Sequence, residues 1–379
     1  MLDFRCELTV IILGSTGSIG VAALEIASLF SHKIEALAAG RNISLLNRQI
    51  LAYRPKFVAI ADERDLKHLE ARGARVFVGE NGICEMLEVA RSALVVNAIV
   101  GFAGLKPSLH TQYCKKTLAL ANKESLVAGG WLLNTKAIVP IDSEHFGLWY
   151  LRTNRAIKRL VITASGGAFR DTPIHTIKDQ TKATALRHPN WQMGQKITID
   201  SASMMNKIFE ILEAYWLFGC KDIEALIERS SSVHALIEFV DGSTTAHFAL
   251  PDMRLPIAYA INPKKASATS IVPSMDLSQI LAIAFDPIDI NRYPLYELKN
   301  TLLENPKLGV VINACNEQAI SHFLQDKIKF GAIYKLVKNA LEFFTIKLPE
   351  LESYTAIATL DKEVRQWCDE AMRDYALSL

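Results

Sequence analysis

The first 140 residues alternate short apolar runs with longer stretches in which apolar positions recur at helical spacing. The largely apolar runs cover residues 10–13, 34–39, 57–60, 94–96 and 118–121, and those at 10–13, 57–60 and 94–96 contain β-branched residues. A helical pattern follows the first run at residues 21–30. This alternation predicts an α/β fold that begins with a Rossmann-like domain built on a parallel sheet.

A second α/β unit is expected from Asp142 to about Asn262. Strand-like segments occur at residues 160–163, 197–199 and 235–240. The sequence Asp241-Gly242-Ser243 then predicts a hairpin turn into a strand over residues 244–250. We expect this central unit to be the catalytic domain.

The last third of the chain has a different pattern. Seven of the thirteen prolines fall between Pro251 and Pro306, which indicates a connecting segment with short pieces of structure. Helical spacing follows at residues 310–324, 333–341 and 362–377 and predicts a C-terminal helical domain. The expected divisions are residues 1–141, 142–262, 263–288 (a linker) and 289–379.

Composition excludes several classes of protein. The net charge of +2 on 379 residues comes without a basic stripe, so we expect no nucleic-acid partner. The longest apolar run, residues 94–105, is too short for a membrane span and contains Asn97, so we expect no membrane partner. The six cysteines are far apart and form no Cys-x-x-Cys pair, which is typical of reduced thiols in the cytoplasm.

A glycine-rich loop, Gly14-Ser15-Thr16-Gly17-Ser18-Ile19-Gly20, stands between the first strand pattern and the first helix pattern. Glycines at such a turn let backbone N–H groups approach a pyrophosphate at the helix N-terminus. The spacing is Gly-x-x-Gly-x-x-Gly, and a plain tight turn is the alternative.

The end of the second strand pattern indicates which dinucleotide would bind. An acid there selects the free 2′-hydroxyl of NAD, but the sequence is Gly40-Arg41-Asn42. A guanidinium pairs well with a 2′-phosphate, so we favour NADPH. Alternatively, Arg41 is an ordinary surface residue.

Two carboxylates lie two residues apart in Asp142-Ser143-Glu144, after an apolar run that ends in Pro140 and Ile141. In extended backbone both would point the same way and could share one cation. Oxygen ligands favour Mg²⁺ or Mn²⁺. The alternative is that Asp142 only caps a helix.

A third carboxylate and a lysine lie in Asn206-Lys207-Ile208-Phe209-Glu210, again among apolar residues. We expect Ser201-Ala202-Ser203 to open a helix on which Asn206 and Glu210 share a face. Serines at a helix start, with Lys207 beside them, would bind a phosphate next to the metal. The alternative is a capped amphipathic helix with solvated charges.

Two further segments have a candidate role. Ser165-Gly166-Gly167 follows a strand pattern and fits either a phosphate-binding nest or a flexible turn. Residues 188–194, His-Pro-Asn-Trp-Gln-Met-Gly, place Trp191 and Met193 in a loop bounded by proline and glycine. Such a loop fits a lid that closes over substrate, or a loop anchored to the core.

In combination and order, these motifs resemble one known family over essentially the full length. The matching segments are residues 13–20, 121–125, 142–145, 165–167, 188–194, 200–210, 251–254 and 313–317. They are similar to the 1-deoxy-D-xylulose 5-phosphate reductoisomerases, NADPH-dependent enzymes of the non-mevalonate isoprenoid pathway. Arg41 is a departure, since relatives often carry lysine there, but the positive charge is kept.

The resemblance implies roles for individual residues. The divalent metal, Mg²⁺ or Mn²⁺, would be held by Asp142, Glu144 and Glu210. Catalytic roles would fall to these three carboxylates, Lys123 and His188. The phosphosugar substrate would contact Lys123, Ser143, Glu144, Ser165, His188, Trp191, Ser201, Asn206, Lys207 and Glu210. NADPH would contact Thr16, Gly17, Ser18, Ile19, Gly40, Arg41, Asn42, Asn122, Glu124 and Gly194.

The implied reaction is the isomerisation of 1-deoxy-D-xylulose 5-phosphate and its reduction to 2-C-methyl-D-erythritol 4-phosphate, by a cytoplasmic homodimer. One rival is an NADP-dependent dehydrogenase that needs no metal. A second rival is a non-catalytic NADPH sensor, against which the presence of Asp142, Glu144, Lys207 and Glu210 argues. Dependence of turnover on Mn²⁺ separates the first rival from the reductoisomerase.

Overall fold

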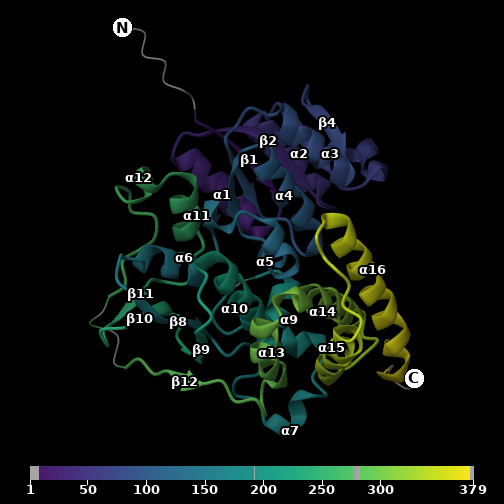
Figure 1. Cartoon of the computed structure of the whole chain (residues 1–379). Coiled ribbons are helices and arrows are strands. Elements are labelled where there is room, and N and C mark those ends of the chain that lie inside the picture. Colours follow the sequence, from purple (N-terminus) through teal and green to yellow (C-terminus); the bar gives the residue numbers. More distant parts are fainter. Residues whose placement is uncertain (1–7, 192, 277, 279–281, 376–379) are drawn as a thin grey trace. The chain divides into compact units, whose positions relative to one another are not determined.

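The computed structural model describes residues 8–191, 193–276, 278 and 282–375. They form two compact units, each with its own sheet (Figure 1). The first unit contains residues 8–122, 133–143 and 252–273, and the second contains the other described residues. The functional division at residues 141, 262 and 288 stays a prediction, since compactness does not assign a role to a segment.

A seven-stranded parallel sheet forms the first unit, as the alternating pattern predicts, in the order β4-β3-β2-β1-β5-β6-β7. The strands are β1 (Thr9–Leu13), β2 (Lys33–Ala39), β3 (Phe57–Ile60), β4 (Arg75–Val78), β5 (Leu94–Asn97), β6 (Thr117–Leu120) and β7 (Ile138–Pro140). The order reverses between β1 and β5. In open α/β sheets, ligands bind where the strand order reverses.

Helices cover both faces of this sheet. They are α1 (Ser18–Leu29), α2 (Ile43–Tyr53), α3 (Gly79–Val89), α4 (Leu105–Tyr113), α11 (Arg254–Ile261) and α12 (Pro263–Ala266), with short 3₁₀ helices at Glu63–His68, Phe102–Gly104 and Thr135–Ala137. Val10 and Ile12 belong to one apolar cluster, whereas Ile11 and Leu13 belong to another. Since both faces are buried, β1 is a continuous apolar run.

A five-stranded mixed sheet in the order β11-β10-β8-β9-β12 forms the second unit. Its strands are β8 (Ile157–Ala164), β9 (Ile223–Ile227), β10 (Val233–Phe239), β11 (Thr244–Phe248) and β12 (Asp286–Pro287). β10 and β11 pair antiparallel around Asp241-Gly242-Ser243, so the predicted hairpin is confirmed. Gly242 has φ 87°, which such a turn requires and glycine adopts easily.

The helices of this unit come from three parts of the chain. The earlier ones are α5 (Lys123–Gly129), α6 (Ser143–Leu151), α7 (Ile174–Ile177), α8 (Lys182–Ala185), α9 (Gln195–Ser203) and α10 (Met205–Phe218), with a 3₁₀ helix at Gly130–Leu132. The later ones are α13 (Lys299–Glu304), α14 (Gly309–Leu324), α15 (Phe330–Thr345) and α16 (Tyr354–Ala371), with 3₁₀ helices at Pro294–Leu298, Pro306–Leu308 and Met372–Tyr375. The C-terminal helices confirm the helical pattern after Lys307.

One predicted strand is wrong. Residues 197–199 belong to α9, not to a strand. Ile199 is buried, and so are Thr198, Ala202 and Ser203, which is the spacing of one helical face. The short segment 197–199, with isoleucine at both ends, fits a strand or a buried helix equally well, and it is helical because α9 packs one face into the core.

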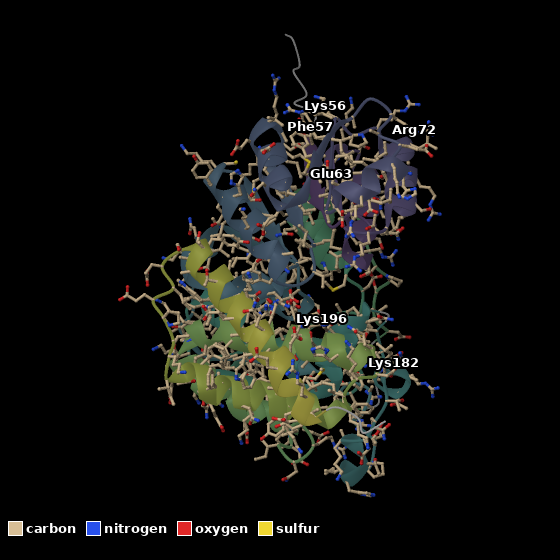
Figure 2. All side chains as sticks on the ribbon, turned by 90° about the vertical axis from the view of Figure 1, so that its right-hand side faces the viewer. Lys56, Phe57, Glu63, Arg72, Lys182 and Lys196 are labelled. Carbon is tan, nitrogen blue, oxygen red and sulfur yellow. The ribbon has the colours of Figure 1, made fainter. Side chains whose placement is uncertain are left out.

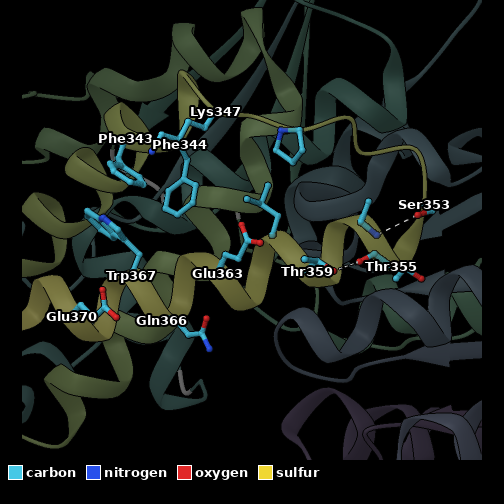
Figure 3. A pocket seen from close by; sticks show the side chains of 13 residues that line it. Phe343, Phe344, Lys347, Ser353, Thr355, Thr359, Glu363, Gln366, Trp367 and Glu370 are labelled. Atoms are coloured by element: carbon cyan, nitrogen blue, oxygen red, sulfur yellow. Dashed lines mark hydrogen bonds between the residues drawn. The ribbon is translucent and has the colours of Figure 1, made fainter.

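A groove with a volume of about 840 Å³ lies between α15 and α16 (Figure 3). The rings of Phe343 and Trp367 in its wall are 5.9 Å apart, and the Lys347 ammonium lies 4.4 Å from the Phe343 ring centre. Its lining contains none of the residues that the sequence predicts for the site.

In the part of the chain that the structure describes, no helix combines the length and the apolar character that crossing a membrane requires.

Candidate active site

Two helices that meet at Met204 form the centre of the candidate site. Met204 has a left-handed backbone (φ 67°), which ends α9 and starts α10 in a new direction. Asn206 and Glu210 are therefore in the first turns of α10. The side-chain amide of Asn206 donates to the Glu210 carboxylate, which confirms that the two residues share a face.

The predicted position of Ser201-Ala202-Ser203 at the start of a helix is wrong. These residues form the last turn of α9, which begins after Gly194. Their backbone N–H groups lie inside a helix and are not free to bind an anion. Only the side chains remain available for that purpose, and the Ser201 hydroxyl points to His188.

Three carboxylates gather at the start of α6 and on α10. Asp142, Glu144 and Glu210 each offer an oxygen, and these oxygens lie within 4.8 Å of one another. Asp142 lies only two residues before Glu144, so the covalent chain keeps the two close. Glu210 is only 1% exposed, and its charge needs compensation at such a depth.

Two lysines contact these carboxylates. Lys123, in the first turn of α5, donates to Asn206 at 2.8 Å and to Glu210 at 2.9 Å. Lys207 donates to Glu144 at 3.0 Å, to the other oxygen of Glu210 and to the backbone carbonyl of Thr163. The carboxylate oxygens of Asp142, Glu144 and Glu210 are hard ligands of the kind that Mg²⁺ and Mn²⁺ prefer.

The geometry at Asp142 and Glu144 differs from the prediction. The chain is not extended there, because α6 begins at Ser143 and Glu144 lies in its first turn. The alternative that places Asp142 directly before a helix is therefore correct as to position. In the predicted extended backbone, the two carboxylates would have pointed the same way by strand alternation. In the structure, the turn that precedes α6 brings them together instead.

Sequence reasoning missed a second group of possible ligands beside the first. Asp142, His145 and Glu213 also have ligand atoms within 4.8 Å of one another. His145 is fully buried, its Nδ1 lies 3.4 Å from the Glu213 carboxylate, and its Nε2 lies 2.8 Å from the backbone oxygen of Glu210. The signal was present, since His145 follows Glu144 directly and Glu213 is one turn beyond Glu210.

His188 joins two of the predicted substrate-binding serines. Its Nε2 lies 3.1 Å from the Ser165 hydroxyl and 3.2 Å from the Ser201 hydroxyl. Its Nδ1 accepts from the backbone N–H groups of Asn190 at 3.2 Å and Trp191 at 2.9 Å, so the proton of the neutral ring is on Nε2. Burial, and secondarily the charge of Arg170, lowers the pKa of His188 to about 4.

The loop around Trp191 has specific anchors. The Asn190 side chain donates to the Arg229 carbonyl at 2.9 Å and to the Ser231 hydroxyl at 2.7 Å. The Trp191 ring lies 6.2 Å from the ring of His234, edge to face. These contacts hold the loop against residues 229–234.

The Ser165 segment packs closely on α9. Gly166 and Gly167 both have positive φ, and a Cβ on Gly167 would lie 2.6 Å from the backbone oxygen of Ser201. Only glycine permits this approach. The tight turn thus brings Ser165 to His188 and Ser201.

The glycine loop lies at the point where the strand order of the first unit reverses. Gly14 follows β1 with φ 81°, and a Cβ there would lie 2.4 Å from the oxygen of Ala98. A Cβ on Gly20 would lie 2.2 Å from the oxygen of Gly14. Gly17, directly before α1, is exposed together with Ser18, and Thr16 and Ile19 are half-buried. The shape suits a pyrophosphate at the start of α1.

Gly40, Arg41 and Asn42 follow β2 and are exposed. Arg41 and Asn42 line a surface pocket of about 700 Å³ that also contains Arg48 and Arg72. Asp65 and Glu70 line it as well, and Arg72 pairs with Glu70 at 2.8 Å, so Arg41 and Arg48 are the guanidinium groups that suit a 2′-phosphate.

The remaining predicted cofactor contacts lie in different places. The Asn122 side chain donates to the carbonyls of Ile99 at 2.7 Å and Gly101 at 2.9 Å in the first unit. Glu124 and Gly194 belong to the second unit. Glu124 accepts from Lys196 at 2.6 Å, a contact that sequence reasoning missed.

Comparison with known proteins identifies the family. Residues 10–130 match the family model described as 1-deoxy-D-xylulose 5-phosphate reductoisomerase. Residues 138–218 and 248–367 match the models of two C-terminal domains of the same enzyme. The chain belongs to the 1-deoxy-D-xylulose 5-phosphate reductoisomerase family.

Members of the family from two bacterial genera are similar over nearly their whole length. The reductoisomerase of Helicobacter pylori J99 is 56% identical over 359 residues, which are 94% of this chain and 98% of the relative. That of Wolinella succinogenes is 51% identical over 358 residues, or 94% of this chain and 99% of the relative.

Solved reductoisomerase structures have the same fold. A crystal structure of DOX-P reductoisomerase in complex with NADPH, fosmidomycin and magnesium superimposes with a TM-score of 0.91 at 32% identity, covering 96% of this chain and 98% of the other. The Zymomonas mobilis enzyme in complex with NADPH gives 0.85 at 33% identity, with the same coverage. The predicted fold class is confirmed.

Proposed function

We propose that this chain carries out the reaction of its family with Asp142, Glu144 and Glu210 as the metal ligands. As a reductoisomerase, it is an NADPH- and divalent-metal-dependent oxidoreductase that converts 1-deoxy-D-xylulose 5-phosphate into 2-C-methyl-D-erythritol 4-phosphate, a step of isoprenoid biosynthesis. The observation that carries the assignment is the cluster of three carboxylates, with Glu210 buried and Asp142 and Glu144 half-buried, whose oxygens lie within 4.8 Å of one another. Mg²⁺ and Mn²⁺ both fit these oxygen ligands.

The metal, when bound, would polarise neighbouring oxygens of the ketose and stabilise negative charge that develops on them. The chain's own contribution is orientation. Lys207 holds Glu144 and Glu210 at fixed positions through its hydrogen bonds to both. Lys123 holds Asn206 and Glu210 in the same way and brings a second positive charge to the substrate site.

The substrate phosphate would lie against hydroxyl, imidazole and amide donors. We assign Ser165, His188, Ser201, Asn206 and Lys207 to this role, with Ser143, Glu144, Lys123 and Glu210 contacting the rest of the sugar. The proton on Nε2 of His188 supports the assignment, because a neutral imidazole with that tautomer donates a hydrogen bond. Trp191 would close over the bound sugar and exclude water.

NADPH would bind along the glycine loop and the end of β2. Thr16, Gly17, Ser18 and Ile19 would contact the pyrophosphate, and Gly40, Arg41 and Asn42 the 2′-phosphate. Asn122, Glu124 and Gly194 are assigned to the rest of the cofactor. The absence of an acid after β2 supports NADPH over NADH.

We also propose that the enzyme is a homodimer in the cytoplasm. β11 is an edge strand of its sheet, and Phe248 on it is 44% exposed. On α6, Trp149 and Tyr150 are 38% and 52% exposed, and the Tyr150 ring lies 5.6 Å from that of His247 on β11. A second copy could cover this apolar surface. Free thiols at Cys84, Cys114, Cys220, Cys315 and Cys368 fit a reducing compartment.

We assign residues 1–141 to the NADPH-binding domain, residues 142–262 to the catalytic domain and residues 289–379 to the helical domain, with residues 263–288 as the linker.

Light scattering on the purified protein tests the dimer. A monomer at micromolar concentration would contradict that part of the proposal.

One assay tests the reaction itself. NADPH oxidation is followed with 1-deoxy-D-xylulose 5-phosphate, with Mn²⁺ and after chelation. We expect oxidation only when substrate and metal are both present. Turnover that persists without a divalent metal would instead favour a simple NADP-dependent dehydrogenase and would overturn the metal assignment.

A further inference from the structure

A line of buried polar contacts connects three helices of the second unit. Lys196, in the first turn of α9, donates to Glu124 on α5 at 2.6 Å and lies 3.0 Å from the Asp200 carboxylate. The other oxygen of Asp200 accepts from the side-chain amide of Asn316 on α14 at 2.7 Å. α5, α9 and α14 are thus tied together through a single ammonium group and its partners.

The partners of Lys196 lie deep in the protein, whereas the Lys196 side chain is 16% exposed. Asn316 is fully buried, Asp200 is 2% exposed and Glu124 is 7% exposed. Desolvation alone would lower the pKa of Lys196, but the negative charges of Asp200, Glu124 and Glu317 outweigh it and raise that pKa well above its usual range. These carboxylates therefore favour the charged form of the Lys196 ammonium.

A buried ion pair is weak evidence of stabilisation, since well-packed apolar side chains often stabilise as much. What such a pair does supply is a fixed geometry. Glu124 directly follows Lys123, whose ammonium contacts Asn206 and Glu210. Lys196 itself lies two residues after Gly194, where the 188–194 loop ends.

We propose that Lys196 is a positioning residue of the reaction: through Glu124 it orients the first turn of α5, and hence Lys123, and through Asp200 and Asn316 it fixes the start of α9. This rests on the proposed function, because Lys123 and the loop have catalytic value only if they contact substrate. Lys196 itself is not among the residues assigned to the substrate or the metal.

The test is Lys196→Met, which keeps the length of the side chain but removes its charge. The matched control is Lys182→Met on α8, whose ammonium makes a half-exposed salt bridge to Asp326 (both lysines are labelled in Figure 2). We expect kcat of the Lys196 variant to fall roughly 10- to 100-fold while the KM for substrate changes less than about 3-fold. The reason is that a displacement of Lys123 by about 1 Å affects the geometry of the reacting complex more than it affects substrate binding. Lys182→Met should retain wild-type kcat.

Two further variants separate positioning from stability. Lys196→Arg keeps the charge and should retain at least about a third of the wild-type kcat. Lys196→Met combined with Asp200→Asn removes one charge of each sign, and the amide oxygen of the replacement side chain would still accept from Asn316. This double variant should therefore unfold at a higher temperature than the single one. Its kcat should nevertheless remain low.

Recovery of kcat together with stability in the double variant would mean that Lys196 is only structural and would overturn the proposal. A single variant with wild-type kcat would do the same. Failure of the proposed function has a different signature, since the wild-type enzyme itself would then not oxidise NADPH with this substrate.

Discussion

Replacing Glu210 by glutamine tests the metal centre most directly. Glu210 is 1% exposed and accepts hydrogen bonds from Lys123, Lys207 and Asn206. Glutamine has the same size but no charge, so the two ammonium groups lose a buried anionic partner. Breaking a buried ion pair on one side costs about 3–5 kcal/mol of folding free energy. We therefore expect a lower unfolding temperature even without metal.

The effect on metal binding has a second, independent magnitude. A ligand at 100 times its dissociation constant stabilises the folded protein by about 2.7 kcal/mol. If loss of the anionic ligand raises the dissociation constant for Mn²⁺ about 100-fold, the same concentration stabilises the variant by only about 0.4 kcal/mol. Thermal unfolding with and without Mn²⁺ measures this difference. Turnover should be abolished, and NADPH affinity nearly unchanged.

Glu213→Gln is the control, because Glu213 lies one turn along the same helix and is equally buried. It belongs to the neighbouring group with Asp142 and His145. We expect this variant to keep its Mn²⁺-dependent stabilisation. If Glu210→Gln keeps that stabilisation and full activity at limiting Mn²⁺, the reasoning is refuted. If only Glu213→Gln loses the Mn²⁺-dependent stabilisation, the metal is held by Asp142, His145 and Glu213 instead.

Three further outcomes are expected. Arg41→Asp should narrow the preference for NADPH over NADH by about 2–3 kcal/mol, the value of a charge-assisted hydrogen bond. If the ratio of the dissociation constants of NADH and NADPH does not change, Arg41 is an ordinary surface residue. The pKa of His188 is about 4 in the folded state and near 6.5 in the unfolded chain, so the unfolded state gains a proton first as pH falls. Wild-type stability should decline between these values, and a His188→Gln variant should show a flatter profile of unfolding temperature against pH. Trp191→Ala should abolish the fluorescence change on adding a chelating phosphonate with Mn²⁺ and lower kcat/KM, whereas normal turnover and ligand-independent hydrogen exchange in the loop would identify it as a fixed part of the core.

The sequence alone determined the elements whose signals are local. The run from Val10 to Leu13 is apolar throughout because both faces of a parallel sheet are covered. The glycine spacing predicts the tight loop that follows it, and neighbouring backbone atoms indeed leave no room for a side chain at Gly14 or Gly20. Asn206 and Glu210 share a helical face because they are four residues apart.

The tertiary structure decided what depends on distant partners. Residues 197–199 are helical because α9 buries one face, and Ser201 then lies at the end of a helix, beside His188. Lys196 finds Glu124 across 72 residues of sequence, and no spacing rule predicts that pair. Residues 252–273 pack with the first unit although they follow the second unit's hairpin in the chain. Local patterns reflect backbone geometry within a few residues and can be recognised in one sequence. Contacts between distant segments depend on how whole elements pack, and no local pattern in a single sequence predicts them.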